Sequence, residues 1–163
     1  MIDFIKYELI NTNPVELENN SYLEFHNKVN TKTGELGVYS NAFYRGLEFK
    51  IYECTDANPN KRITIEGSLH KYWNKGAHNF NDFGINEIDE VIGNLKKKFG
   101  IIPQNCVLKQ LEIGVNINPP QKTKSILNNC LLHKTKRFKW VFTNDEGNYI
   151  QVQNQRHYIK IYD

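Results

Sequence analysis

One amphipathic helix, set between runs of alternating residues, constrains the fold of this chain most. Apolar side chains between residues 85 and 99 recur at spacings of three and four and form one stripe, made of Ile85, Ile88, Val91, Ile92, Leu95 and Phe99. Gly100 follows where glycine often ends a helix, and the lysines at 96–98 suit the negative end of the helix dipole. Such a helix must bury its stripe against another layer.

Runs of alternating polar and apolar residues lie on both sides of this helix. Leu47, Phe49 and Ile51, for example, alternate with polar neighbours as in a half-buried strand. The pattern predicts strands at 2–10, 21–27, 47–52, 61–68, 106–117, 137–143, 148–153 and 156–162, a hairpin turn at 31–37 and a second helix at 121–132. This order predicts an α+β fold in one domain, 1–163, with an antiparallel sheet and two helices packed on one face.

The second face of that sheet is expected to stay open, because its side chains are polar. Alternation in the strand 106–117 assigns Leu111 to the covered face, and Leu108 and Glu112 to the open one. The open face is predicted to hold Glu66, Gln110, Glu112, Asn116, Tyr149, Gln151, Tyr158, Lys160 and Tyr162.

The cysteines and the net charge indicate which cellular location and which partners to expect for the protein. Cys54, Cys106 and Cys130 form no CxxC motif, which argues against a zinc finger or a disulfide framework and favours a reducing, cytoplasmic location. No apolar run is long enough to span a bilayer, so no membrane partner is expected. The net charge of +3 allows an anionic partner without requiring one.

The segment 63–79 is a candidate site. It runs from an alternating strand into Glu66, His70 and His78. A carboxylate and imidazoles near the end of a strand suit a divalent cation. A surface role is the alternative, because Glu66 could equally pair with a neighbouring basic side chain and a lone loop histidine is usually solvated.

Glu112 is a second candidate metal ligand. It lies in the middle of a predicted strand, between Leu111 and Ile113, where a carboxylate is costly unless it is solvated, paired or bound to a metal. Mg²⁺ or Mn²⁺, which prefer oxygen ligands with an occasional imidazole, would suit it. Plain exposure on the polar face is the alternative.

The tyrosines of the last two predicted strands are candidate nucleophiles. Alternation places Tyr158, Lys160 and Tyr162 on one face, and Tyr149 can join them from the neighbouring strand. A tyrosine hydroxyl can attack a phosphodiester when the developing charge is neutralised. Tyrosine is also common in strands, so a packing role stays open.

A basic and aromatic segment follows the second predicted helix. Between residues 133 and 140 it combines positive charge with aromatic rings, a composition that suits single-stranded nucleic acid. The alternative is that the charged side chains of this segment are simply solvated. The candidate nucleic-acid contacts are Lys134, Lys136, Arg137, Lys139 and Trp140. Tyr72 and Trp73 are added as rings that could stack on bases or could simply pack.

Taken together, several segments resemble the gene II replication initiators of filamentous phages, and related phage and plasmid replication proteins of Bacteroidetes more closely still. The motifs that carry this resemblance are the initial Met-Ile-Asp, residues 46–53, the strand and turn at 65–79, the strand 108–116 and the end 156–162, in the same order and at similar spacing. The resemblance implies an HUH-type nuclease palm, a central antiparallel sheet flanked by helices. It also implies a longer protein, of which this chain would be the N-terminal part.

The resemblance implies a metal site for Mg²⁺ or Mn²⁺. Glu112 matches an acidic position in the family's Arg-x-Asp strand, although Gln110 stands where the arginine usually lies. His78 matches the histidine of a Gly-His-Asn segment, with Ala77 inserted. The family's His-hydrophobic-His pair is absent, so either the metal is held by a mixed set of Glu112 and His78, assisted by Glu66 or His70, or it is not held here.

The resemblance also implies a rolling-circle initiator. Such proteins nick one strand of a replication origin through a tyrosine, stay attached to the 5′ phosphate and leave a 3′ hydroxyl; host replication proteins are further expected partners. Tyr162 matches the family's tyrosine in a Tyr-x-Lys segment, and Tyr149 resembles the alternative tyrosine of related plasmid initiators. The rival hypothesis is a module of the same fold that binds nucleic acid or protein without catalysis.

Overall fold

The computed structural model describes residues 2–54, 61–115, 117–142 and 149–162. Where the sequence predicted one domain, the chain divides into two compact units, Met1–Asn116 and Ile117–Asp163. Within the described residues, no helix combines the length and the apolar character needed to cross a bilayer.

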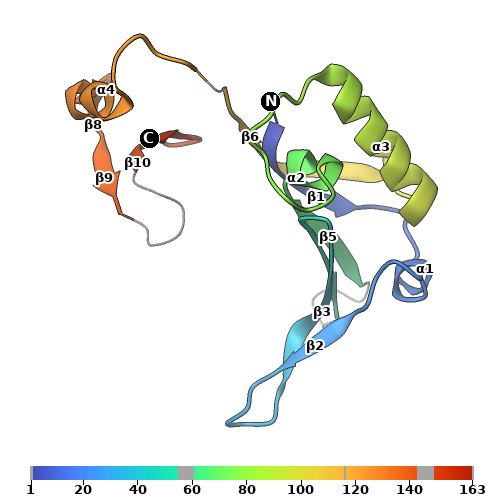
Figure 1. Cartoon of the computed structure of the whole chain (residues 1–163). Helices are drawn as coiled ribbons and strands as arrows, with labels where there is room; N and C mark the ends of the chain where they lie inside the picture. The colour runs from blue at the N-terminus through green and yellow to red at the C-terminus, as the bar shows by residue number, and fades with distance from the viewer. Residues whose placement is uncertain (1, 55–60, 116, 143–148, 163) are drawn as a thin grey trace. The chain divides into compact units, whose positions relative to one another are not determined.

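The first unit is built on a six-stranded antiparallel sheet in the order β2-β3-β4-β5-β1-β6 (Figure 1). Its strands are β1 (Ile2–Leu9), β2 (His26–Val29), β3 (Leu36–Tyr44), β4 (Leu47–Tyr52), β5 (Arg62–Gly67) and β6 (Cys106–Ile113). The predicted strands at 2–10, 47–52 and 61–68 are confirmed within one residue at each end. The strand predicted at 21–27 begins later, at His26, and the predicted turn at 31–37 joins β2 to β3.

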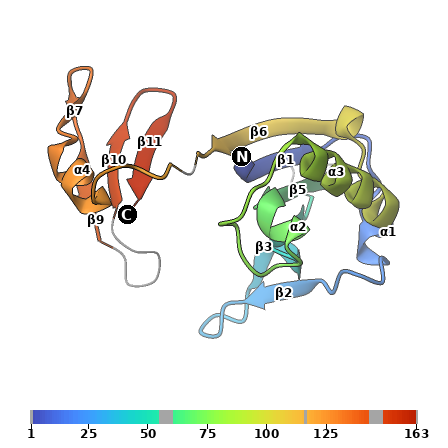
Figure 2. The same ribbon diagram turned by 45° about the horizontal axis from the view of Figure 1, so that its top comes forward.

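One face of this sheet packs against helices, as Figures 1 and 2 show for α2 and α3. The helices of the unit are α1 (Pro14–Glu18), α2 (Leu69–Trp73) and α3 (Ile85–Phe99), with a 3₁₀ turn at Pro103–Asn105. The core joins Ile5, Phe49 and Ile65 of the sheet to Leu95 and Phe99 of α3. Val91, Leu95 and Phe99 of the predicted stripe are therefore buried, and Ile88 and Ile92 are half-buried, whereas Ile85 in the first turn of α3 is exposed. The α+β class is confirmed.

A close approach of two glycines fixes the start of α2. Gly67 ends β5 with a φ of 142°, and a Cβ built there would lie 2.1 Å from the carbonyl oxygen of Gly46. The next residue, Ser68, accepts a hydrogen bond on Oγ from the Lys71 amide at 3.2 Å and so caps α2. The sequence pattern predicts no helix here, because α2 is only five residues long.

A β-bulge changes the two faces of β6 from those predicted. Gln110 lies opposite Lys6, whereas Leu108 lies opposite Tyr7, so the register shifts by one residue between these pairs. As a result Leu108 joins Leu111 on the helix side of the sheet, where both line an apolar pocket of about 320 Å³ next to α3. The prediction that Leu108 shares the open face with Glu112 is therefore wrong.

The second unit is small and consists of one helix and short strands. Its elements are α4 (Thr123–Asn129), β7 (Leu132–His133), β8 (Lys136–Arg137), β9 (Lys139–Val141), β10 (Tyr149–Gln153) and β11 (Tyr158–Tyr162). The last three form an antiparallel sheet in the order β11-β10-β9. Leu127, Ile150 and Val152 are its buried core.

The predicted open face therefore belongs to two different sheets. Glu66 and Glu112 lie on the six-stranded sheet, whereas Tyr149 and Tyr162 lie on the three-stranded one. The second predicted helix is α4, and it belongs to the second unit. Asn116, which was assigned to the same face, lies outside the described residues.

Candidate functional site

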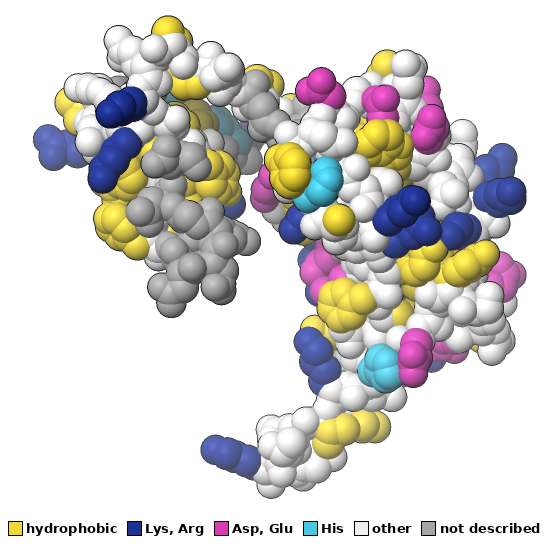
Figure 3. Space-filling view, in the orientation of Figure 1, with side chains coloured by type: hydrophobic (Ala, Val, Ile, Leu, Met, Phe, Trp, Pro, Cys, Tyr) yellow, Lys and Arg dark blue, Asp and Glu magenta, His cyan; other side chains and the backbone are white. Residues whose placement is uncertain are grey.

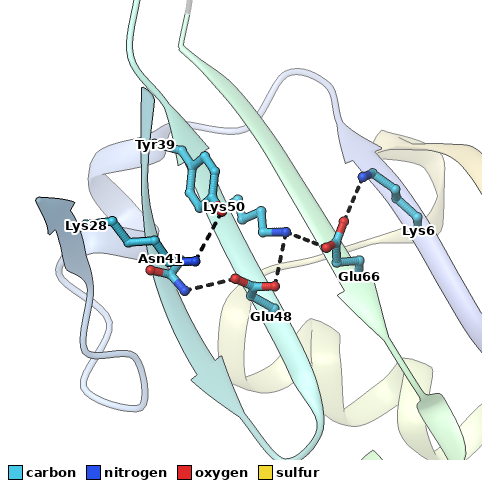
Figure 4. Close-up of polar contacts among 7 residues, drawn as sticks. All are labelled: Lys6, Lys28, Tyr39, Asn41, Glu48, Lys50 and Glu66. Atoms are coloured by element: carbon cyan, nitrogen blue, oxygen red, sulfur yellow. Dashed lines mark hydrogen bonds and ion pairs between the residues drawn. The ribbon is translucent and has the colours of Figure 1, made fainter. Parts of the chain in front are cut away.

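Glu66 lies in an ion-pair network on the face of the six-stranded sheet opposite the helices (Figure 4). Its Oε2 is 2.7 Å from Lys6 Nζ, and its Oε1 accepts a hydrogen bond from Lys50. Lys50 also pairs with Glu48 at 3.0 Å, and Asn41 Nδ2 donates to Glu48 at 2.9 Å. The network thus balances two carboxylates with two ammonium groups.

The pKa values of this network show that its central pair stays charged. Burial alone would raise the pKa of Glu66, but hydrogen bonds and charge from Lys50 and Lys6 outweigh it and lower that pKa below 4.5. Burial likewise opposes the charge of Lys50, yet Glu66 and Glu48 raise its pKa above the usual value. A divalent cation would have to displace these ammonium groups, so Glu66 is an ion-pair partner and does not support the predicted ligand role.

His70 is a core residue. Its side chain is buried, and its ring stacks on Phe83 with centroids 4.7 Å apart and planes 9° from parallel. Its Nε2 lies 2.7 Å from Asn81 Oδ1, which also accepts a hydrogen bond from Asn74 at 2.7 Å. These contacts explain why the short helix α2 carries a histidine, and they give no support to a metal role.

His78 lies in the loop between α2 and α3. Its ring stacks on Phe80 with centroids 4.0 Å apart, and its carbonyl oxygen accepts a hydrogen bond from Asn74 Nδ2 at 2.9 Å. The next residue, Asn79, donates to Asp3 Oδ1 at 2.8 Å and ties this loop to the start of β1. The loop is therefore held in place by amide side chains.

Glu112 lies on β6, opposite Phe4 of β1, and is half-buried. Its Oε1 accepts a hydrogen bond from Gln110 Nε2 at 3.1 Å. Nowhere in the described ranges do three or more His, Cys, Asp or Glu side chains gather as a metal site would require. The predicted ligands Glu112, His78, Glu66 and His70 are thus not brought together there as one ligand set.

Tyr72 and Trp73 are engaged in packing. Tyr72 is 2 % exposed, its hydroxyl donates to Asn94 Oδ1 at 2.7 Å, and burial raises its pKa to about 12. Trp73 is half-buried and donates from Nε1 to Glu90 Oε2 at 3.2 Å. Of the two alternatives for Tyr72, base stacking and packing, the structure supports packing, because its ring is inside the core.

Tyr149 and Tyr162 face each other across the β10–β11 hairpin. They are directly opposed in the register, and their rings lie 4.9 Å apart. Tyr158 and Lys160 share this face by alternation along β11, and Lys160 Nζ lies 6.0 Å from the centre of the Tyr149 ring. The predicted common face of these four residues is confirmed, and we call it the tyrosine face.

The basic and aromatic segment does not act as a single surface. Lys139 lies opposite Gln151 and therefore on the tyrosine face, whereas Trp140 lies opposite Ile150 on the other face and stacks with Phe142 at 6.0 Å. Lys136 donates to the carbonyl oxygen of Gln153 at 2.8 Å. The remaining predicted contacts, Lys134 and Arg137, are exposed.

The charge of the chain is divided unequally between the two units. Residues 117–163 hold eight Lys and Arg against three Asp and Glu, a net charge of +5, whereas residues 1–116 hold 13 against 15, a net charge of −2. On the side of the first unit seen in Figure 3, basic and acidic side chains are interspersed. The overall net charge of +3 does not reveal this difference between the units. Counting the charged residues in successive segments of the sequence would have revealed it.

Comparison with known proteins gives no relative on which to base a function. No protein-family model, no curated protein and no solved structure matches the chain.

Proposed function

We propose that this chain is a DNA-binding and DNA-cleaving domain of a rolling-circle replication initiator, similar to the gene II proteins of filamentous phages. The observation that carries the proposal is the opposed pair of Tyr149 and Tyr162 beside Lys160, on a unit with a net charge of +5. A positive unit attracts the phosphates of DNA. A pair of tyrosines beside an ammonium group supplies nucleophiles where phosphate charge is neutralised.

The reaction proposed for the tyrosine face is a transesterification. The phenolic oxygen of Tyr162, or of Tyr149, forms a bond to the phosphorus of a phosphodiester while the bond from phosphorus to the 3′ oxygen breaks. The DNA 5′ phosphate is then linked to tyrosine, and the leaving 3′ oxygen takes up a proton in exchange for the one that the phenol loses. Lys160 would offset the charge on the phosphate oxygens during this exchange.

The resemblance behind this proposal implies Mg²⁺ or Mn²⁺ and a nuclease-like palm. The antiparallel six-stranded sheet with helices on one face is compatible with such a palm. Among the described residues, the predicted ligands do not gather into a metal site. Glu66 is held by Lys6 and Lys50, and His70 is buried against Phe83. The reaction above therefore contains no step through a metal ion.

A second candidate function is DNA binding without cleavage. The contacts of Glu66 and His70 support it, because they leave neither side chain as a metal ligand. A module that binds single-stranded DNA without cutting it would need the positive unit and the exposed Trp140–Phe142 pair, and no metal ligands. Its binding would weaken steeply with salt and would be insensitive to chelators.

A covalent adduct distinguishes the two candidates. The full chain is incubated with a labelled single-stranded DNA library of random sequence, with Mn²⁺ or with EDTA, and run on a denaturing gel. Cleavage predicts a shifted covalent band, which Tyr149→Phe or Tyr162→Phe abolishes and Tyr158→Phe, on the same face, leaves intact. Salt-sensitive binding without a band identifies the binding module, and a band that survives both substitutions together contradicts the assignment of the tyrosines.

A further inference from the structure

We infer that Lys139, Gln151 and Lys160 form the seat for a DNA phosphate beside Tyr149 and Tyr162. This inference rests on the proposed function, since it assumes that single-stranded DNA reaches the tyrosine face. It adds the side chains that position the phosphate, drawn from all three strands of the small sheet.

The register places these three side chains in one row across the sheet. Gln151 of β10 lies opposite Lys139 of β9 on one side and opposite Lys160 of β11 on the other. Directly opposed residues of antiparallel strands project from the same face. The adjacent row contains Tyr149, with Tyr162 opposite it on β11.

The spacing of the row suits a single phosphate group. Neighbouring strands lie about 4.8 Å apart, so the two outer lysines start from backbones about 10 Å apart. Their flexible side chains can both reach one phosphate above Gln151, whose amide can donate a third hydrogen bond. Lys160 Nζ is already 6.0 Å from the Tyr149 ring, so a phosphate held there lies next to the phenols.

The electrostatic setting distinguishes these lysines from three lysines of the six-stranded sheet. On the six-stranded sheet Lys6, Lys50 and Lys109 are each paired with a glutamate. Residues 117–142 and 149–162, the described part of the second unit, include no Asp or Glu at all. Within that part, the charges of Lys139 and Lys160 are not compensated by a carboxylate, which suits an anionic ligand.

Two measurements on the full chain test this phosphate seat. The first is the affinity for a fluorescent single-stranded oligonucleotide, measured by anisotropy over a range of salt concentrations. Lys139→Gln and Lys160→Gln should each weaken binding severalfold and reduce the slope of log K against log[salt] by about 0.7, the value for one contact to a single-strand phosphate. Lys32→Gln, an exposed lysine of the first unit, serves as the control for loss of one charge and should leave the slope unchanged.

The second measurement is the yield of the covalent tyrosine adduct, which should fall further than binding does in both variants and recover in Lys160→Arg. Unchanged slope and yield in Lys139→Gln and Lys160→Gln, with the wild-type chain forming its adduct, would overturn the phosphate seat while leaving the proposed cleavage intact. A wild-type chain that neither binds nor forms an adduct would overturn both. Equal melting temperatures of the variants and the wild-type chain exclude a loss of folding as the cause.

Discussion

Lys50 of β4 and Glu66 of β5 form an ion pair on the open face of the six-stranded sheet, with side chains only 12 % and 18 % exposed. Each partner has a second contact of opposite charge, Glu48 for Lys50 and Lys6 for Glu66 (Figure 4). The pair therefore occupies the position where the sequence predicted a metal ligand. Its role is to stabilise the sheet, and this role can be measured.

Removing one partner of this pair should destabilise the first unit. Lys50→Met leaves Glu48 and Glu66 close together without their shared cation, and we expect a loss of roughly 1–3 kcal/mol in the free energy of unfolding. Lys61→Met is the control, because the pairs of Lys61 with Glu18 and Glu53 are more exposed; it should cost less than about 1 kcal/mol. Urea denaturation measures the free energy of unfolding of both variants. Equal losses would contradict the expectation that the Lys50 network stabilises the sheet more than the exposed pairs of Lys61 do.

The lowered pKa of Glu66 predicts how stability changes with pH. Because the pKa of its carboxyl group in the folded state lies below 4.5, its contribution is fully present above that pH and is lost as the pH falls through the folded-state pKa. Glu66→Gln should therefore be less stable than the wild-type chain at pH 7, with the difference shrinking in acid below about pH 4. Denaturation curves at several pH values measure this, and a difference independent of pH would refute the assignment.

Gly67 should tolerate no side chain. A Cβ at this position would lie 2.1 Å from the backbone oxygen of Gly46, and the φ of 142° is one that other residues rarely adopt. Gly67→Ala should cost about 2–4 kcal/mol, because backbone must shift on both strands. Gly93→Ala is the matched control: nothing lies within 4 Å of that Cβ inside α3, so alanine should stabilise by about 0.5–1 kcal/mol.

Tyr72 and Trp140 should respond oppositely to substitution. Tyr72→Phe removes the hydrogen bond to Asn94 in the core and should cost about 1 kcal/mol in stability without changing affinity for single-stranded DNA. In the binding-module candidate, which uses Trp140 to stack on a base, Trp140→Leu should leave stability nearly unchanged and weaken DNA binding about tenfold, the loss of one stacked base. Anisotropy and melting of the same samples measure both, and weaker DNA binding by Tyr72→Phe would contradict the core assignment.

The parts of the fold that the sequence predicted well are those with a strong period. The stripe of α3 and the alternation of β4 and β5 each have several residues in phase, so their faces follow from local sequence. The tyrosine face followed in the same way from β11. In each case the side-chain period decides which residues share a face.

Other features depend on contacts that local sequence does not encode. The bulge that moves Leu108 to the helix side arises from the pairing of β6 with β1, and α2 is too short for a periodic signal. The ligand set failed for a similar reason. Glu66 alternates correctly onto the open face, but its partners Lys6 and Lys50 come from the neighbouring strands.

The most direct test of the proposed function is to identify the amino acid that becomes linked to DNA. The full chain is allowed to react with single-stranded DNA of random sequence, the DNA is digested with nuclease, and the peptides are analysed by mass spectrometry. We predict a nucleotide attached through phosphate to Tyr162 or Tyr149, and none on Tyr158. A nucleotide on any other residue, or a chain that binds this DNA and carries none, would contradict cleavage by the tyrosine face.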